Sequence, residues 1–482
     1  MSNLSKILGS VKHIHFIGIG GSGMYPLAQI LHNKGYYLSG SDNNETETLA
    51  AVRNMGIPVF MGQRAENIEG AEVIVYTAAI MNDNPELIAA KNSGKPVLER
   101  SEMLGYITSL YNNAICVAGT HGKTTTCSML TSILVCAGLD ISAFIGGKLP
   151  LIGGSGLLGN SEIFVCEACE FNDTFLHLEP DTSVILNIDN DHLDYFGNME
   201  NLISSFGKFS ALTSGKIFIF GDDDKTRQTV HKLNNTIITF GEQKVNTFFA
   251  DFINCLSKGY SFVLYYNKKL DNNHLNSKKS EYSTEMLGTI NLNVPGKHNI
   301  INALAAASVS FDLGVSFEHI KKGLETFTGA GRRFEIIGKF GGAVVVDDYA
   351  HHPTEIAATL RAAKDMPYKR VIAVFQPFTF SRTKMLLNDF AEALQIADVT
   401  VLTDIMGSRE KNEYGIYTSD LAAITPNSVF FEQDKSAADT DKRKEENFGD
   451  VIEYVKKIAE EGDLIIILGC GDVYKIAKAI VD

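Results

Sequence analysis

The stretch that decides the fold reads Gly119-Thr120-His121-Gly122-Lys123-Thr124-Thr125. An apolar run over residues 114–118 precedes it, and a run with helical spacing of apolar residues follows it and ends near Gly138. A strand, a glycine-rich turn and a helix cup a phosphate, because backbone N–H groups point into the turn and the helix N-terminus adds positive potential. The sequence therefore predicts a phosphate-binding loop over residues 119–125.

Two side chains of this loop suit a nucleotide. Lys123 adds a full positive charge, and the Thr124 hydroxyl is placed to ligate a Mg²⁺ ion shared with the phosphates. The common phosphate-loop pattern has a glycine at the position of Val117, so the loop here is shorter than the common one. An ordinary glycine-rich turn is the alternative interpretation.

The composition indicates a multidomain protein. The 482 residues exceed what one core holds, and two to four domains are expected. A net charge of −14 argues against a nucleic-acid-binding protein, which needs a basic face. The sequence has no run of about 18 apolar residues, residues 1–12 lack a secretory pattern, and the seven cysteines are scattered. We expect a cytoplasmic protein with neither nucleic-acid nor membrane partners.

A second glycine-rich loop lies near the N-terminus. An apolar strand pattern over residues 13–17 runs into Gly18-Ile19-Gly20-Gly21-Ser22-Gly23, and after a helical pattern a further strand ends in Asp42. This matches the dinucleotide fingerprint, in which the loop holds a diphosphate and the acidic residue a ribose hydroxyl. NAD is one interpretation, but the additional Gly21 and Met24 are not part of its pattern. The fingerprint indicates a diphosphate without saying whose.

Two further strand ends carry candidate metal ligands. Residues 163–166 run into Glu167, and residues 182–188 run into a segment that contains His192. Ligands gather at the carboxyl ends of parallel strands, so these two side chains should converge with Thr124. A hydroxyl, a carboxylate and an imidazole can hold a divalent ion together with nucleotide phosphates. A lone histidine is more often a solvated loop residue, but beside two other candidates we favour a ligand.

The rest of the chain predicts a peripheral hairpin and a further α/β segment. Short β-like runs occupy residues 240–294, with a polar turn over residues 271–280. In the helix that follows, Asn299 could pair with a base edge or simply cap the helix. Strand patterns then alternate with helical runs, which predicts another doubly wound unit.

We therefore predict an α/β protein of three domains. An N-terminal Rossmann-like domain occupies residues 1–107 and a central ATP-binding α/β domain with the phosphate loop occupies residues 108–325. A C-terminal Rossmann-like α/β domain occupies residues 326–482.

Six motifs occur along the chain in a fixed order. They are residues 18–24, 119–125, Glu167-Ala168-Cys169-Glu170, Asp191-His192, 298–303 and 347–353. Together they resemble the Mur ligases of peptidoglycan synthesis, and the resemblance extends from His13 to Lys475. The branch that adds L-alanine is the most similar one, because residues 172–178 and 187–194 look like that branch.

The resemblance implies ATP-driven amide formation in peptidoglycan precursor synthesis. The implied substrates are UDP-N-acetylmuramate, L-alanine and ATP, with Mg²⁺ as cofactor. The lactyl carboxylate would take the γ-phosphate of ATP, and the amine of alanine would then displace phosphate from the acyl phosphate. Closure of the C-terminal domain would keep water from that intermediate. The protein is expected to be a monomer or a homodimer.

The resemblance also assigns roles to single residues. The UDP-sugar-binding residues are Gly18, Gly20, Gly21, Ser22, Gly23, Met24 and Asp42. The ATP-binding residues are Gly119, Thr120, His121, Gly122, Lys123, Thr124, Thr125, His298, Asn299, Arg333 and Asp347. The catalytic residues are Lys123, Glu167, His192, His351 and Arg382. The metal ligands are Thr124, Glu167 and His192.

Some residues depart from the family pattern. Phe378 stands where a histidine is common, Thr379 where many relatives have an arginine, and Met406 where an aromatic residue is common. Tyr25 and Pro26 replace small residues after the first loop. The departures leave the phosphate, metal and adenine residues in place and concern the contacts to the amino acid and the sugar substrate.

Other functions stay open on the sequence. A paralogous ligase that attaches a recycled tripeptide to UDP-N-acetylmuramate would share the loops. An NAD-dependent oxidoreductase would explain only residues 18–42 and leave Lys123, Glu167 and His192 unused. A non-catalytic nucleotide-binding module is a third candidate, and the same three residues count against it.

Overall fold

The computed structural model describes residues 8–21, 23–77, 79–269, 282–408, 410–431 and 448–482. Ser22 and the polar turn predicted over residues 271–280 lie outside the described residues. The chain divides into two compact units. The first comprises Met1–Asp251, Val263–Thr289 and Ile301–Thr326, and the second comprises Phe252–Phe262, Ile290–Ile300 and Phe327–Asp482.

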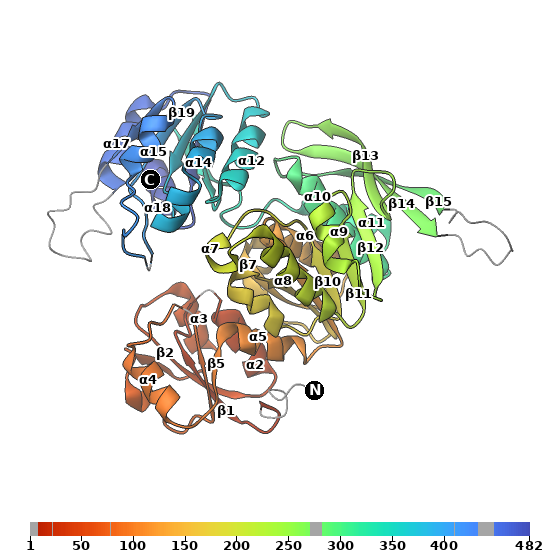
Figure 1. Cartoon of the computed structure of the whole chain (residues 1–482), viewed down its shortest axis with the longest axis vertical. Coiled ribbons are helices and arrows are strands. Elements are labelled where there is room, and N and C mark those ends of the chain that lie inside the picture. The colour runs from red at the N-terminus through yellow and green to blue at the C-terminus, as the bar shows by residue number, and fades with distance from the viewer. Residues whose placement is uncertain (1–7, 22, 78, 270–281, 409, 432–447) are drawn as a thin grey trace. The chain divides into compact units, whose positions relative to one another are not determined.

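A five-stranded parallel sheet opens the first unit. Its strand order is β3-β2-β1-β4-β5, so the chain reverses direction of winding between β1 and β4. Helix α4 covers one face, and α2 and α5 cover the other (Figure 1). The elements are β1 (His13–Ile17), α2 (Tyr25–Asn33), β2 (Tyr37–Asp42), α3 (Glu47–Asn54), β3 (Val59–Met61), β4 (Val73–Tyr76), α4 (Pro85–Asn92), β5 (Val97–Glu99) and α5 (Arg100–Thr108).

The second sheet has the order β15-β14-β13-β12-β11-β10-β6-β9-β7-β8. Its strands from β13 to β7 run parallel, and β8 is antiparallel to β7. The strands are β6 (Asn113–Ala118), β7 (Ser142–Leu149), β8 (Gly154–Leu157), β9 (Ile163–Ala168), β10 (Thr182–Ile185), β11 (Lys216–Phe220), β12 (Thr236–Gly241), β13 (Phe248–Cys255), β14 (Tyr260–Lys269) and β15 (Tyr282–Asn291). The helices are α6 (Lys123–Cys136), α7 (Leu193–Phe196), α8 (Met199–Ala211), α9 (Asp224–Val230), α10 (His298–Asp312) and α11 (Phe317–Thr326), with the 3₁₀ turn η3 (Phe171–His177).

The third sheet belongs to the second unit and has the order β16-β17-β21-β18-β19-β20. Only β16 is antiparallel to its neighbour among the described strands of this sheet. Separate apolar clusters fill its two faces. The elements are β16 (Glu335–Phe340), β17 (Ala343–Asp348), α12 (Pro353–Lys364), β18 (Arg370–Phe375), α13 (Phe380–Met385), α14 (Leu387–Leu394), β19 (Val399–Leu402), α15 (Thr418–Ile424), β20 (Ser428–Phe430), α17 (Gly449–Ile458), β21 (Asp463–Leu468) and α18 (Tyr474–Val481).

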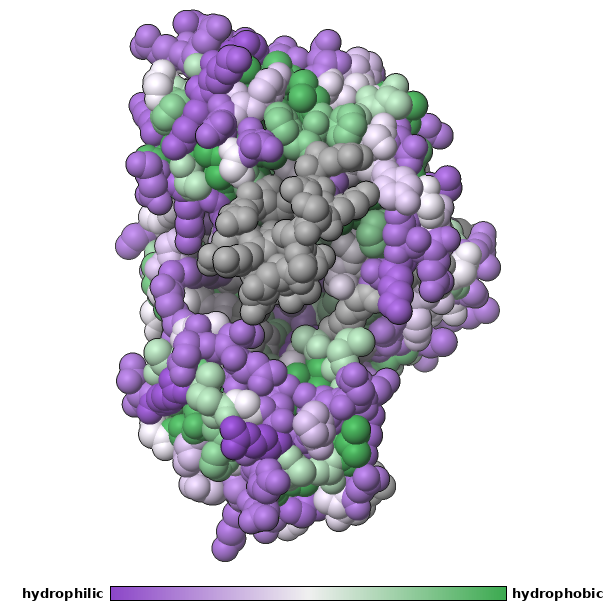
Figure 2. Space-filling model, turned by 90° about the vertical axis from the view of Figure 1, so that its left-hand side faces the viewer, coloured by the Kyte–Doolittle hydropathy of each residue, from purple (hydrophilic) through white to green (hydrophobic). Residues whose placement is uncertain are grey.

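The structure confirms the predicted α/β class with three largely parallel sheets. Two strand limits differ from the prediction. Strand β9 includes Glu167, and β10 ends at Ile185 rather than at residue 188, because the chain beyond it turns to bond the phosphate loop. No described helix is both long and apolar enough to cross a bilayer. On the face drawn in Figure 2, hydrophilic residues predominate and hydrophobic ones occur in small groups.

Candidate active site

The predicted phosphate loop joins β6 to α6, and its glycines make the turn possible. Gly119 and Gly122 have φ of +145° and +87°, a region that side chains with a Cβ rarely adopt. A Cβ on Gly122 would also collide with the side-chain amide of Asn302, which lies beneath the loop. The Asn302 amide oxygen accepts a hydrogen bond from Thr126 Oγ1 at 3.3 Å. Asn302 thus supports the loop from α10, one helical turn after the predicted Asn299.

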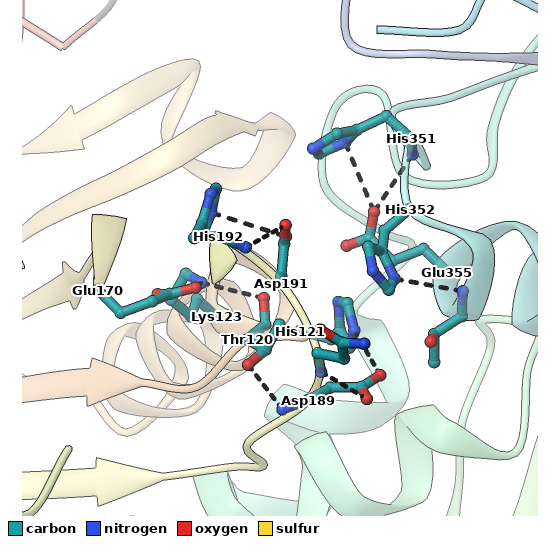
Figure 3. Close-up of polar contacts among 12 residues, drawn as sticks. Thr120, His121, Lys123, Glu170, Asp189, Asp191, His192, His351, His352 and Glu355 are labelled. Carbon is teal, nitrogen blue, oxygen red and sulfur yellow. Dashed lines mark hydrogen bonds and ion pairs between the residues drawn. The ribbon is translucent and has the colours of Figure 1, made fainter. Parts of the chain in front are cut away.

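The segment after β10 holds the loop in place. Asn187 accepts the Thr120 amide through its carbonyl at 3.1 Å and the His121 amide through Oδ1 at 2.8 Å. The Asp189 amide donates to Thr120 Oγ1 at 2.9 Å, and the Asp189 carboxylate lies 3.2 Å from His121 Nε2 (Figure 3). These hydrogen bonds therefore join the loop after β6 to the segment that follows β10. No role for the Asn187 or Asp189 side chain was predicted from the sequence.

Lys123 lies at the first position of α6 and is mostly buried. Its ammonium donates to the Gly119 carbonyl at 2.5 Å, to the Thr120 carbonyl at 3.1 Å and to Glu170 Oε2 at 2.8 Å (Figure 3). Burial by itself lowers the pKa of Lys123, but the charge and hydrogen bond of Glu170, together with the charges of Cys169 and Glu167, outweigh it, and the pKa is raised above its ordinary value. The lysine is therefore held charged inside the loop.

The three strand ends that the sequence predicted to converge are neighbours in the sheet. Strand β6, which leads to Thr124, lies between β9 and β10, and Glu167 on β9 pairs with Val117 on β6. Glu167 Oε1 accepts the Gly146 amide from β7 at 2.5 Å. The carboxylate is thus oriented beside the phosphate loop by the adjacent strand.

His192 follows β10 in a conformation that a histidine rarely adopts. Its φ is +56°, and its ring contacts the Phe171 ring with the centroids 4.8 Å apart. Its amide donates to Asp191 Oδ1 at 2.8 Å. A hydroxyl, a carboxylate and an imidazole on adjacent strand ends form a donor set that fits a hard divalent cation next to phosphates. The role of each as a ligand stays a prediction.

The first glycine loop is held by the strand beside it. The amides of Gly18 and Ile19 both donate to the Ser41 carbonyl, at 2.8 and 3.0 Å, and the Gly20 amide donates to Asp42 Oδ2 at 2.9 Å. Asp42, predicted to bind a ribose, is therefore also a support of the loop. Met24, predicted to bind the UDP-sugar, is 1% exposed, so its side chain packs in the core, and its amide donates to the Gly21 carbonyl at 2.9 Å.

A cation lies beside the first loop that the sequence analysis did not single out. A Cβ on Gly23 would lie 3.3 Å from Arg100 Cδ and 3.9 Å from Arg100 Nη1. Arg100 begins α5, behind an N-cap formed by Glu99. A basic residue at the positive end of a helix is electrostatically unfavourable. That placement was the one signal in the sequence that could have pointed to Arg100.

In the second unit, Asp347 pairs with Arg332, to which no role was assigned from the sequence. Arg332 Nε donates to Asp347 Oδ2 at 3.0 Å, and its Nη2 donates to the Gly469 carbonyl at 2.6 Å. Burial raises the pKa of Asp347 to about 6, although the Arg332 charge lowers it. Asp347 Oδ1 is buried and has no hydrogen-bond partner among the described residues. Arg333 instead lies 3.7 Å from Glu355.

The predicted His351 and Arg382 lie on two segments of the second unit. His351 Nδ1 is 3.1 Å from the Tyr349 carbonyl and 3.5 Å from Glu355 Oε2, and its amide donates to the same carboxylate at 3.3 Å (Figure 3). Arg382 lies on α13 and is half-buried. Burial raises the pKa of the Cys470 thiol to about 12, and the positive charge of Arg382 acts in the opposite direction.

Two departures from the family pattern contact each other. Phe378 and Met406 form an isolated parallel bridge, in which the Met406 amide donates to the Pro377 carbonyl and the Thr379 amide to the Met406 carbonyl, each at 2.9 Å. Thr379 has a φ of +63°. The Phe378 ring lies edge-on to the His351 ring, with the centroids 6.2 Å apart.

In the predicted adenine-binding motif, the Asn299 side chain bonds to backbone close to it in sequence. Asn299 Nδ2 donates to the Pro295 carbonyl at 2.6 Å, so its amide fastens the start of α10. His298 is the first residue of that helix. Asn299 is the second residue of the helix, and its role in binding a base stays a prediction.

Two glycine loops at the carboxyl ends of parallel strands, one of them with a buried lysine, are typical of an enzyme that binds two phosphorylated ligands. The family models of the Mur ligases match most of the chain. The catalytic domain of the family matches residues 13–112, the middle domain residues 117–310 and the glutamate ligase domain residues 332–471. The chain belongs to the Mur ligase family.

Individual relatives match over nearly the whole chain. The UDP-N-acetylmuramate–L-alanine ligase of Caldanaerobacter subterraneus subsp. tengcongensis is 41% identical over 98% of this chain and 97% of its own length. The crystal structure of the UDP-N-acetylmuramate–alanine ligase of Thermotoga maritima has a TM-score of 0.74 at 28% identity and covers 98% of both chains. A murein peptide ligase of Psychrobacter arcticus has a TM-score of 0.70 at 24% identity, covers 97% of this chain and 98% of its own, and shows the fold alone.

Proposed function

We propose that this protein is an ATP-dependent ligase that joins L-alanine to UDP-N-acetylmuramate in peptidoglycan precursor synthesis. The observation that carries the proposal is the 41% identity, over almost the full length of both chains, to a relative with that activity in its name. The retained Lys123, Glu167 and His192 support an active enzyme. An NAD-dependent oxidoreductase would leave all three without a task.

The reaction proceeds in two steps. A lactyl carboxylate oxygen attacks the γ-phosphorus of ATP, the bond from that phosphorus to the leaving oxygen of ADP breaks, and an acyl phosphate forms. The amine nitrogen of L-alanine then attacks the acyl carbon, the bond to the phosphate oxygen breaks, and the amine loses a proton. The products are the amide, ADP and phosphate.

ATP binds at the loop of residues 119–125 in this proposal. Lys123 offsets charge on the β- and γ-phosphates, and the amides of the first turn of α6 point at the same oxygens. The bonds from Asn187 and Asp189 hold the loop in one shape before the nucleotide arrives. Preorganised donors of this kind stabilise developing charge without reorganisation during the reaction.

Mg²⁺ is proposed to bind at Thr124, Glu167 and His192. When bound, it would screen the repulsion between the attacking carboxylate and the phosphates. The Gly146 amide orients the Glu167 carboxylate, and the Phe171 ring packs against the His192 imidazole, which limits its rotation. The support for this site is the order of β9, β6 and β10 in the sheet.

The sugar nucleotide and the amino acid are proposed to bind elsewhere on the chain. The loop of residues 18–23 would hold the diphosphate of UDP, with Arg100 beside it as a cation. By resemblance to the family, Asp347 would contribute to ATP binding. By resemblance to the family, His351 and Arg382 would act near the acyl phosphate.

We also propose the domain limits 1–107, 108–325 and 326–482, because each of the three sheets lies within one of these ranges. The substrates favour a cytoplasmic location, since ATP is made and used there. The net charge of −14 supports the absence of a nucleic-acid partner. A monomer or a homodimer remains the expected oligomeric state.

A screen of phosphate release tests the function. Purified protein is incubated with ATP, Mg²⁺ and UDP-N-acetylmuramate, and L-alanine, glycine, L-serine and the recycled tripeptide are added singly. We expect phosphate release and a new amide product with L-alanine. Release with the tripeptide but not with L-alanine would assign the chain to the peptide-recycling branch instead.

A further inference from the structure

The ammonium group of Lys123 has no donor left over for a phosphate. An ammonium carries three N–H donors. They point to the Gly119 carbonyl, the Thr120 carbonyl and the Glu170 carboxylate, the last at 2.8 and 3.2 Å to its two oxygens. A phosphate that enters the loop must therefore take the place of at least one of these partners.

Glu170 is the partner that a phosphate resembles most. The two carbonyls belong to the loop itself and are neutral, whereas Glu170 is an anion at the end of β9. A phosphate oxygen offers the same charge and the same acceptor geometry as the carboxylate it would replace. The ammonium would then exchange one anion for another.

The pair is buried, which makes the exchange energetically important. The side chain of Glu170 is 2% exposed and that of Lys123 is 15% exposed. Removing one member of a buried pair leaves an uncompensated charge, which strongly destabilises the protein that contains it. A bound phosphate would compensate that charge again, so the loss should be visible in the nucleotide-free protein and much smaller in the nucleotide-bound one.

We propose that Glu170 is a positioning residue that occupies the place of a nucleotide phosphate on Lys123 while the loop is empty, and that nucleotide binding displaces it. Glu170 holds the lysine extended within the loop between catalytic cycles. Because the nucleotide must compete with it, Glu170 also weakens the binding of ADP and thereby eases product release. The inference rests on the proposed binding of ATP at this loop.

The experiment compares thermal unfolding and ADP affinity in the full chain of the wild type, Glu170→Gln and Glu170→Asp. Ligand that binds only the folded state raises the Tm in proportion to its binding free energy. Without nucleotide, Glu170→Gln should unfold several degrees below the wild type. With saturating ADP this gap should shrink by at least half, and calorimetry should give a Kd for ADP roughly tenfold lower than that of the wild type.

Control measurements separate this role from general support of the fold. Glu162→Gln removes an exposed carboxylate that stands just before the same strand and should change neither the Tm nor the ADP affinity. Adenosine, which has no phosphate, should bind Glu170→Gln and the wild type alike. Glu170→Asp keeps the charge but withdraws it by one methylene, and its Kd for ADP should lie between the other two.

A gap in Tm that persists or widens with ADP, or an unchanged or weaker ADP affinity of Glu170→Gln, would overturn the inference. If Glu170→Gln does not fold, the Kd of Glu170→Asp for ADP tests the inference instead. A Kd no lower than that of the wild type would then overturn the inference. A wild type whose Tm does not respond to ADP would instead refute the proposed nucleotide site. The two failures are therefore distinguishable.

Discussion

The two glycine loops of the first unit share a backbone plan and differ in where their charge comes from. Each follows a parallel strand and opens a helix. In the loop of residues 18–23, the Ser41 carbonyl and the Asp42 carboxylate accept the first amides, and the nearby cation, Arg100, comes from α5. In the loop of residues 119–125, the cation is Lys123 of the loop itself.

The difference separates holding a phosphate from transferring one. In the first loop, several amides donate to the neighbouring strand, and the cation comes from another helix. Such a loop suits a diphosphate that stays intact. A loop with a buried, charged lysine next to a candidate metal site suits a phosphate on which charge develops during a reaction. The glycine spacing indicates that a loop can accommodate a phosphate. The position of the cation indicates whether that phosphate is only bound or is transferred.

The largest effect that this comparison predicts is that of Lys123→Ala. Phosphate release should fall by at least about a hundredfold, because the charge that offsets the γ-phosphate is lost. The Kd for UDP-N-acetylmuramate, measured by calorimetry, should stay within about twofold of the wild type, since the other loop is proposed to bind it and distant sites act independently. Loss of both activities together would show that the two loops do not act separately.

A second prediction concerns the metal. Glu167→Gln should raise the Mg²⁺ concentration for half-maximal phosphate release by roughly tenfold or more, because an anionic ligand is replaced by a neutral amide. Titration of Mg²⁺ at saturating ATP measures this, with Glu162→Gln, which removes an exposed carboxylate just before the same strand, as the control. An unchanged titration would remove Glu167 from the metal site.

A third prediction sharpens the assignment of the first loop. Arg100→Met should weaken the binding of UDP-N-acetylmuramate by roughly tenfold, because the proposed ion pair between the half-buried Arg100 guanidinium and a phosphate is lost. Arg100→Lys should retain most of the affinity, and ADP binding should be unaffected in both. If Arg100→Met binds the sugar nucleotide normally, the diphosphate is held by backbone amides alone.

The smallest effect is expected for Asp42→Asn. The amide oxygen can still accept the Gly20 amide, so the loop should keep its shape and the Kd for the sugar nucleotide should rise only by about twofold to fivefold. Asp42→Ala removes the acceptor and should have the larger effect of the two. Equal losses in both variants would indicate that the carboxylate acts on the ligand directly, as in the ribose contact of the dinucleotide fingerprint.

Much of the candidate site could be predicted because it is local. Gly119 and Gly122 indicate a turn with positive φ, and Lys123 belongs to the same short stretch. Glu167 and His192 each follow a strand pattern. Side chains that act from distant parts of the chain carry no such mark. Asn302, Asn187 and Arg100 were missed because each reaches a loop that is far from it in sequence.

The second unit shows the same limit for charged pairs. Arg332 and Arg333 are adjacent in the sequence, and the resemblance assigned an ATP-binding role to Arg333 and none to Arg332. The backbone at Arg332 has a φ of +57°, which turns its side chain to Asp347 and the Gly469 carbonyl and leaves Arg333 near Glu355. A single left-handed residue decides which neighbour faces the carboxylate, and no pattern in the sequence announces it.

The α/β class, the two glycine-rich loops and the family follow from the sequence alone, because hydrophobic periodicity, glycine spacing and short motifs are properties of neighbouring residues. The tertiary structure alone decided which groups lie around Lys123 and Arg100. Glu170 belongs to a motif that the sequence analysis quoted, yet its contact with Lys123 depends on β9 lying beside β6. Strand order sets such contacts, and strand order arises from long-range packing.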